Sequence, residues 1–141
     1  MTEAAYVALV ADVKAAEGLR LKAYQDSVGV WTCGYGTNLQ ELTINETLAE
    51  AWLHQKLQEA ERDARTFPWY TDLTSRQQRA IVELVYNLGL TRLRKFRRTL
   101  AALAVGDYEA ARVGLLNSLW ARQVGPTRSN RIADALRDQE T

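Results

Sequence analysis

The sequence has little of the residue types that build disulfide-linked or metal-stabilised proteins. Its 141 residues include one cysteine, Cys33, and one histidine, His54. A single cysteine cannot form a disulfide within the chain, and no Cys and His set has the spacing of zinc ligands. With only two prolines, eight glycines and 47% hydrophobic residues, the chain is neither collagen-like nor disordered. We therefore expect one folded domain over residues 1–141, with no metal and no cofactor.

Long hydrophobic runs are also missing. The apolar stretch nearest the amino terminus, Ala4 to Val10, has no basic flank before it and is followed by Asp12 and Lys14. It is too short for a membrane span and lacks the pattern of a signal peptide. The sequence therefore predicts a protein that stays in the cytoplasm of the producing cell, without an export signal and without membrane insertion.

Charge of one sign is not in excess, because 18 basic residues face 17 acidic ones. This balance argues against a nucleic-acid partner. Residues 1–70 hold six basic and ten acidic side chains (net −4), whereas residues 71–141 hold twelve and seven (net +5). Five cations fall within residues 92–98. They indicate either a patch that adheres to an anionic surface, or a solvated helix face.

Hydrophobic periodicity predicts mostly helices. A first helix spans residues 3–16 and ends before Gly18. A capping box of Thr43 with Glu46 predicts the start of a long helix, and Thr74 with Gln77 predicts the start of a strongly apolar central helix that ends at Gly89. Three further helices are expected at residues 92–105, 107–119 and 127–137.

The stretch between Leu21 and Asn38 has a different character. Aromatic and β-branched residues lie on both sides of a turn at Asp26, which predicts a β-hairpin. The predicted class is α+β, with a small lobe over about residues 17–60. A helical large lobe would comprise about residues 61–141 together with helix 3–16.

Three polar residues fall within or beside this hairpin: Glu17, Asp26 and Thr32. Glycosidic bond cleavage uses one protonated carboxylic acid and a second carboxylate that activates water or attacks carbon. Glu17 and Asp26 could form such a pair across a groove. The alternative is that Asp26 merely forms the turn.

The whole string of residues 17–36, EGLRLKAYQDSVGVWTCGYG, resembles the phage-type lysozymes, which are muramidases of glycoside hydrolase family 24. Their spacing of a Glu, eight residues, an Asp, five residues and a Thr is met by Glu17, Asp26 and Thr32. The similarity extends to residues 85–89, 96–100, 106–111, 118–120 and the Arg-rich last helix. It implies the lysozyme-like α+β fold.

The resemblance assigns roles to individual residues. Glu17 would be the general acid, and Asp26 with Thr32 would hold the attacking water, giving inversion. Arg128 would pair with this acid. Substrate contacts would come from Tyr24, Asn38, Tyr86, Asn87 and Thr99. For two of them a structural alternative stays open, with Tyr86 packing in the core and Asn87 capping its helix.

By the same resemblance, the protein would be an endolysin that hydrolyses the β-1,4 bond between N-acetylmuramic acid and N-acetylglucosamine in peptidoglycan. It would act as a monomer and reach the wall through a separate holin. A lytic transglycosylase and an inactive wall-binding module are the alternatives. The sequence departs from the family at Thr37 and Lys56, where some members have a histidine and an acid that pair.

Overall fold

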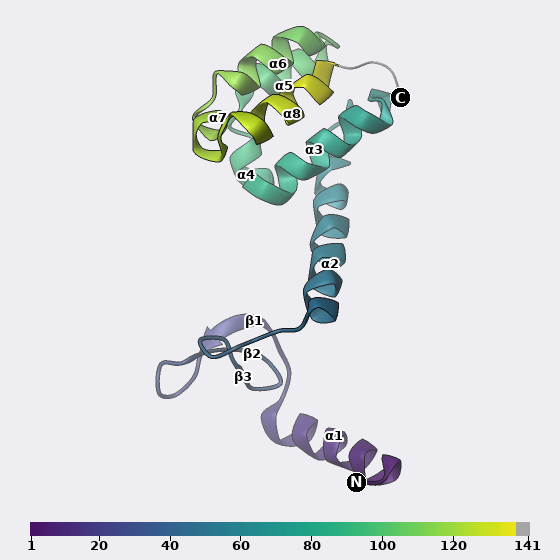
Figure 1. The fold of residues 1–141 in the computed structure, drawn as a ribbon, viewed down its shortest axis with the longest axis vertical. Coiled ribbons are helices and arrows are strands. Elements are labelled where there is room, and N and C mark those ends of the chain that lie inside the picture. The colour runs from purple at the N-terminus through teal and green to yellow at the C-terminus, as the bar shows by residue number, and fades with distance from the viewer. Residues whose placement is uncertain (138–141) are drawn as a thin grey trace. The chain divides into compact units, whose positions relative to one another are not determined.

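The structure, a computed structural model, describes residues 1–137 and divides the chain into two compact units (Figure 1). The first unit is Met1–Glu46, and the second begins at Thr47. The first holds one helix and a small sheet, and the second is helical. The predicted α+β class is confirmed. The predicted grouping of the first helix with the large lobe stays a prediction.

The first unit begins with helix α1 (Glu3–Glu17). The hydroxyl of Thr2 accepts a hydrogen bond from the Ala5 amide at 3.1 Å and caps the helix start. Gly18 ends the helix with a φ of 70°, a conformation that glycine adopts without a Cβ penalty. The helix predicted over residues 3–16 is thereby confirmed.

Three short strands follow: β1 (Arg20–Gln25), β2 (Trp31–Gly34) and β3 (Thr37–Asn38). They form one antiparallel sheet in the order β1-β2-β3. The hairpin between β1 and β2 is confirmed. The two-residue strand β3 was not predicted as a strand, since so short a segment carries no alternation of its own.

The long helix α2 (Glu46–Ala64) starts later than predicted. Thr43 with Glu46 was expected to form the capping box, but the helix begins only at Glu46, so Thr43 cannot be its N-cap and that prediction is wrong. Asn45 directly precedes the helix and is also a favoured capping residue type. Near the other end of α2, Ala60 and Ala64 are buried.

A short 3-10 helix at Tyr70–Asp72 leads into the central helix α3 (Ser75–Leu88). Its capping box is confirmed: the Thr74 hydroxyl accepts from the Gln77 amide at 3.2 Å, and the Gln77 side chain accepts from the Thr74 amide at 2.9 Å. The Gln77 side chain also donates to the carbonyl of Leu136 at 2.8 Å. One glutamine therefore caps α3 and ties it to the last helix.

The remaining helices are more broken than predicted. The expected helix 92–105 is two helices, α4 (Leu90–Leu93) and α5 (Arg97–Ala104), because Phe96 has a ψ of 63°, which no α-helix accommodates. The expected helix 107–119 ends at Leu116 as α6 (Tyr108–Leu116). Ser118 then caps a separate α7 (Leu119–Val124), and α8 (Pro126–Arg137) matches the last prediction.

The apolar core of the second unit lies between α3, α5, α6 and α8, which pack together in Figure 1. Ile81, Leu84, Leu103, Leu115 and Ile132 are almost completely buried there. Trp120, at 3% exposure, belongs to the same core. Over residues 1–137, no helix is long and apolar enough to cross a membrane.

Candidate functional site

Glu17 is the last residue of α1, and its side chain lies against Gly36 in the turn between β2 and β3. A Cβ atom built on Gly36 would lie 2.8 Å from Cδ of Glu17 and would overlap its Oε2. Gly36 also has a φ of +74°, which disfavours any other residue. The space for the Glu17 carboxyl therefore exists because position 36 has no side chain.

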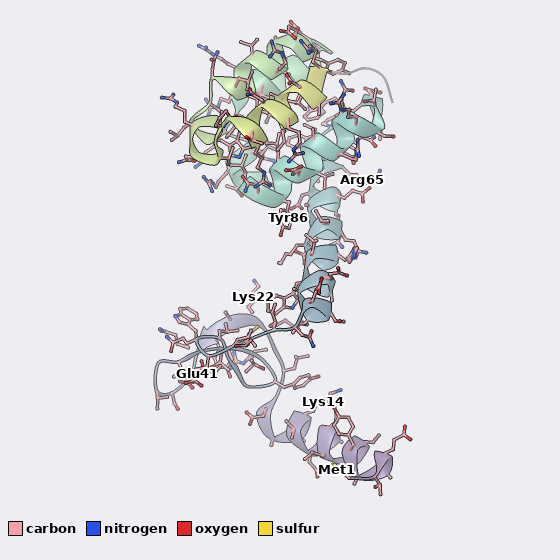
Figure 2. All side chains as sticks on the ribbon, in the orientation of Figure 1. Met1, Lys14, Lys22, Glu41, Arg65 and Tyr86 are labelled. Atoms are coloured by element: carbon pink, nitrogen blue, oxygen red, sulfur yellow. The ribbon has the colours of Figure 1, made fainter. Side chains whose placement is uncertain are left out.

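A second contact links the same turn to α1. The ammonium group of Lys14, labelled in Figure 2, lies 5.5 Å from the centre of the Tyr35 ring, a cation–π distance. Lys14 is in the last turn of α1, one turn before Glu17. Two neighbouring residues of the turn, Tyr35 and Gly36, thus contact the end of the helix that carries the candidate acid.

Asp26 forms the turn between β1 and β2. Its Oδ1 accepts hydrogen bonds from the amides of Val28 and Val30, each at 2.9 Å, and its own amide donates to the Val30 carbonyl at 2.9 Å. The turn-forming interpretation of Asp26 is therefore confirmed. It leaves a catalytic role open, because the other carboxyl oxygen, Oδ2, makes no hydrogen bond within residues 1–137.

Thr32 lies opposite both Tyr24 on β1 and Asn38 on β3. Directly paired residues point to the same face of a sheet, so these three predicted site residues form one row. Thr32 is only 6% exposed, and its hydroxyl donates to the Val30 carbonyl at 3.0 Å. Its neighbour Cys33 is less buried.

The other members of the row are held by polar contacts. The guanidinium of Arg20 lies over the Tyr24 ring, 4.7 Å from its centre. Asn38 accepts a hydrogen bond from the Gln40 amide through Oδ1 at 2.9 Å. The amide nitrogen of the Asn38 side chain is the group that this arrangement leaves to donate to a ligand.

The second unit carries the remaining predicted substrate contacts. Tyr86, labelled in Figure 2, lines a cavity of about 690 Å³ with Leu53 and Val82. It is 44% exposed, so the core-packing alternative is wrong. Asn87 lies inside α3, whose C-cap is Gly89, so the capping alternative is wrong too. Instead Asn87 Oδ1 accepts from the Trp120 indole nitrogen at 2.7 Å. Its side chain therefore holds the core tryptophan.

Arg128 has a partner that the sequence did not indicate. Its Nε donates to Glu83 of α3 at 3.1 Å, and Arg131 donates to both oxygens of the same carboxylate at 3.0 and 2.7 Å. The hydrogen bonds from Arg131, and then those from Arg128, hold the pKa of Glu83 below its usual value, against the effect of partial burial. An acid within the apolar run of α3 is the signal that could have pointed to Glu83.

Pairing of Arg128 with Glu17 stays a prediction. Lys56, which replaces an acid of the family, pairs with Glu59 at 3.1 Å. Thr99 is 2% exposed and lines a groove on the second unit.

Comparison with known proteins identifies the family of the chain. The family model described as phage lysozyme matches residues 14–134, which include every site residue named above. An endolysin from Acyrthosiphon pisum secondary endosymbiont phage 1 is 39% identical over 103 residues, covering 70% of this chain and 68% of that protein. Probable T4-type lysozyme 1 of Dictyostelium discoideum is 24% identical over 150 residues, covering 85% and 88%. The chain belongs to the phage lysozyme family.

Proposed function

We propose that this protein is an endolysin that hydrolyses the β-1,4 bond between N-acetylmuramic acid and N-acetylglucosamine in peptidoglycan, with inversion at the anomeric carbon. Family membership supports a glycosidase that degrades the bacterial wall. The observation that carries the finer proposal is the common anchor of Asp26 and Thr32: both side chains bond to the backbone of Val30.

Glu17 is the general acid in this proposal. Its carboxyl is exposed at the end of α1, lies against Gly36, and makes no side-chain hydrogen bond or ion pair over residues 1–137. A carboxylic acid that is free to donate can protonate the glycosidic oxygen as the bond to the anomeric carbon breaks. Removal of a general acid of this kind costs roughly 10²- to 10⁴-fold in rate.

Asp26 and Thr32 position the attacking water. The hydrogen bonds that they already make determine which of their oxygens can accept a hydrogen bond from this water. The Thr32 hydroxyl donates its proton to Val30, so its oxygen can only accept from a further partner. Asp26 Oδ1 is occupied by two amides, which leaves Oδ2 as an acceptor. A water that donates one proton to each of these oxygens presents its lone pair to the sugar, as a nucleophile must.

This arrangement favours inversion. An inverting enzyme keeps its two carboxyl groups roughly 6.5–9.5 Å apart to admit water, whereas a retaining enzyme brings them to about 5 Å. Asp26 has one oxygen committed to its own turn, and Thr32 adds a second acceptor beside it. A water site built from two acceptors fits base-assisted attack better than direct attack by Asp26.

The sugar and its substituents would contact Tyr24 and Asn38 in the first unit, and Tyr86, Asn87 and Thr99 in the second. Tyr24 offers a ring for an apolar sugar face, and Asn38 offers an amide for an acetamido group. Arg128 uses Nε for Glu83, and within the described chain its terminal nitrogens make no hydrogen bond. Those nitrogens are the groups with which it would pair with Glu17.

The protein would work as a monomer on glycan strands, wait in the cytoplasm of the producing cell, and reach the wall through a holin. The deciding experiment is product analysis of digested peptidoglycan, with the anomeric configuration recorded at early times. Reducing ends of inverted configuration are expected. Anhydro-sugar products would instead indicate a lytic transglycosylase, retained configuration would overturn the water mechanism, and no loss of turbidity would indicate a wall-binding module.

A further inference from the structure

A groove of about 470 Å³ lies on the second unit, lined by residues of α4 to α7 and their connections. Leu88, Phe96 and Trp120 contribute apolar surface to it. Its cationic lining consists of Arg92, Lys95, Arg97 and Arg98, which are all exposed. None of the residues that line the groove is acidic, and over residues 1–137 none of these four cations forms an ion pair.

Two of these cations lie where they destabilise α5. The amino end of a helix carries partial positive charge and is stabilised by acids, yet the first turn of α5 holds Arg97 and Arg98 and no acid. Phe96, the N-cap, provides no side-chain hydrogen bond. The backbone N–H groups at residues 97–99 are therefore left without the acceptor that a Ser or Asp cap supplies.

Thr99 adds a hydroxyl to these donors. The residue is 2% exposed, and its side chain makes no hydrogen bond in the described chain. Over residues 1–137, every fully enclosed side-chain oxygen or nitrogen has a hydrogen-bond partner. The Thr99 hydroxyl has none, so it is not fully enclosed and must open onto the groove that Thr99 lines. It is a nearly buried polar group that faces the groove without a protein partner.

Gly114 of α6 leaves room in front of Thr99. A Cβ atom at position 114 would lie 2.9 Å from the Thr99 hydroxyl oxygen and 3.6 Å from the Thr99 amide nitrogen. Glycine within a helix is less favourable than alanine. At this position the missing side chain keeps a space next to both donors of Thr99.

We infer that this groove is an anion site for the phosphate groups of a polyanionic polymer. Uncapped amides, one hydroxyl and the Arg97 and Arg98 guanidiniums offer more donors than the two oxygens of a carboxylate can take, and phosphate supplies more acceptors. Arg92 and Lys95 extend the positive charge along the groove beyond the helix end, so a chain of phosphates fits better than one. The inference concerns binding, gives Thr99 a phosphate ligand in place of the sugar contact named above, and holds whether or not the proposed hydrolysis is right.

The first experiment is an NMR titration of the full-length protein with inorganic phosphate at low salt. The amide signals of Arg97, Arg98 and Thr99 should shift together. Replacing both Arg97 and Arg98 by Ala should weaken binding by about tenfold or more, since the charge-assisted hydrogen bonds from both guanidiniums to the phosphate are lost. Arg94→Ala is the matched control, because Arg94 belongs to the same basic run but does not line the groove; it should change affinity by only about twofold.

Two further variants separate a ligand site from a merely structural one. Gly114→Ala would place a Cβ atom 2.9 Å from the Thr99 hydroxyl oxygen and should weaken phosphate binding, and Thr99→Val should weaken binding without unfolding the protein. Equal shifts with acetate would overturn phosphate as the ligand. Absence of shifts at residues 97–99 would overturn the site itself.

The source of the phosphate is tested with sodium polyphosphate and with vesicles of phosphatidylglycerol. The polymer should bind at least about tenfold more tightly than inorganic phosphate, and its binding should depend on Arg97 and Arg98. If the protein bound the vesicles through Arg97 and Arg98 but did not bind polyphosphate, the polymer would be excluded as the ligand and a lipid headgroup would be indicated.

Discussion

The two units of this chain are organised by different forces. In residues 1–46 the one buried side chain is Thr32, and the candidate site is arranged by turn hydrogen bonds, strand pairing and two close contacts with α1. The second unit has an apolar core from Ala60 to Leu136. The comparison teaches that substitutions in the first unit should mainly change chemistry, whereas core substitutions in the second should mainly change stability.

The largest expected effect is on the chemical side of this comparison. Glu17→Gln should lower lysis of wall suspensions by roughly 10²- to 10⁴-fold or more, because an amide cannot protonate the leaving oxygen. The melting temperature should stay close to that of the unchanged protein, since Glu17 makes no ion pair over residues 1–137. Lytic activity above one tenth of the unchanged level would remove Glu17 from the acid role.

The opposite effect is expected in the second unit. Leu115 of α6 is fully buried in the apolar core. Leu115→Ala should lower the free energy of unfolding by about 2–5 kcal/mol, measured by urea denaturation, through lost burial and a cavity. At a temperature where the variant is folded, its activity on short soluble oligosaccharides should be little changed. A large loss of kcat in the folded variant would show that the two units are not separable in this way.

The β2–β3 turn provides a matched pair of glycines. Gly34 and Gly36 have φ values of +69° and +74°, so alanine strains both backbones alike, but only at Gly36 would the Cβ meet Glu17. Gly36→Ala should lower kcat on the order of 10²-fold by displacing the acid, while Gly34→Ala loses stability only. Equal kcat values for the two variants would mean that Gly36 does not position Glu17.

Thr32 tests the water mechanism. Thr32→Ser keeps the hydroxyl and should retain activity within about tenfold, whereas Thr32→Val keeps the β-branched shape and should lose about 10²-fold or more. Circular dichroism melting should show both variants folded. A covalent sugar on Asp26 in the mass spectrum of the unchanged protein would contradict a water held by Asp26 and Thr32.

Local patterns were enough to predict much of the fold. The Thr74 and Gln77 capping box, the apolar face of α3 and the hairpin around Asp26 each depend on residues a few positions apart. The start of α2 was misplaced because Thr43 and Asn45 are both good capping types within three residues of Glu46. The break between α4 and α5 at Phe96 was not predicted, because no glycine or proline marks it in the sequence.

The candidate site also has a part that local sequence spacing could predict and a part that it could not. Glu17, Asp26 and Thr32 could be proposed from spacing, since they fall within sixteen residues of one another. Glu83 and Arg128 are forty-five residues apart and meet through the packing of α3 and α8. Helical periodicity shows which face of each helix is apolar but does not show which two helices meet.

The smallest effect we expect comes from this long-range ion pair. The pKa of Glu83 is lowered in the folded protein from its usual 4.5, mainly by hydrogen bonds from Arg131. A lowered carboxyl pKa stabilises the fold above about pH 4.5, and this contribution is lost as the pH falls through the folded-state value. Glu83→Gln should therefore reduce the melting temperature at pH 6–7 and narrow the gap to the unchanged protein at pH 3. Glu109→Gln is the control, because Glu109 forms an exposed pair with Arg112 within α6 and should change little. A gap for Glu83→Gln that stays constant from pH 7 to pH 3 would mean that the ionised carboxylate contributes nothing and that the residue matters only for its shape.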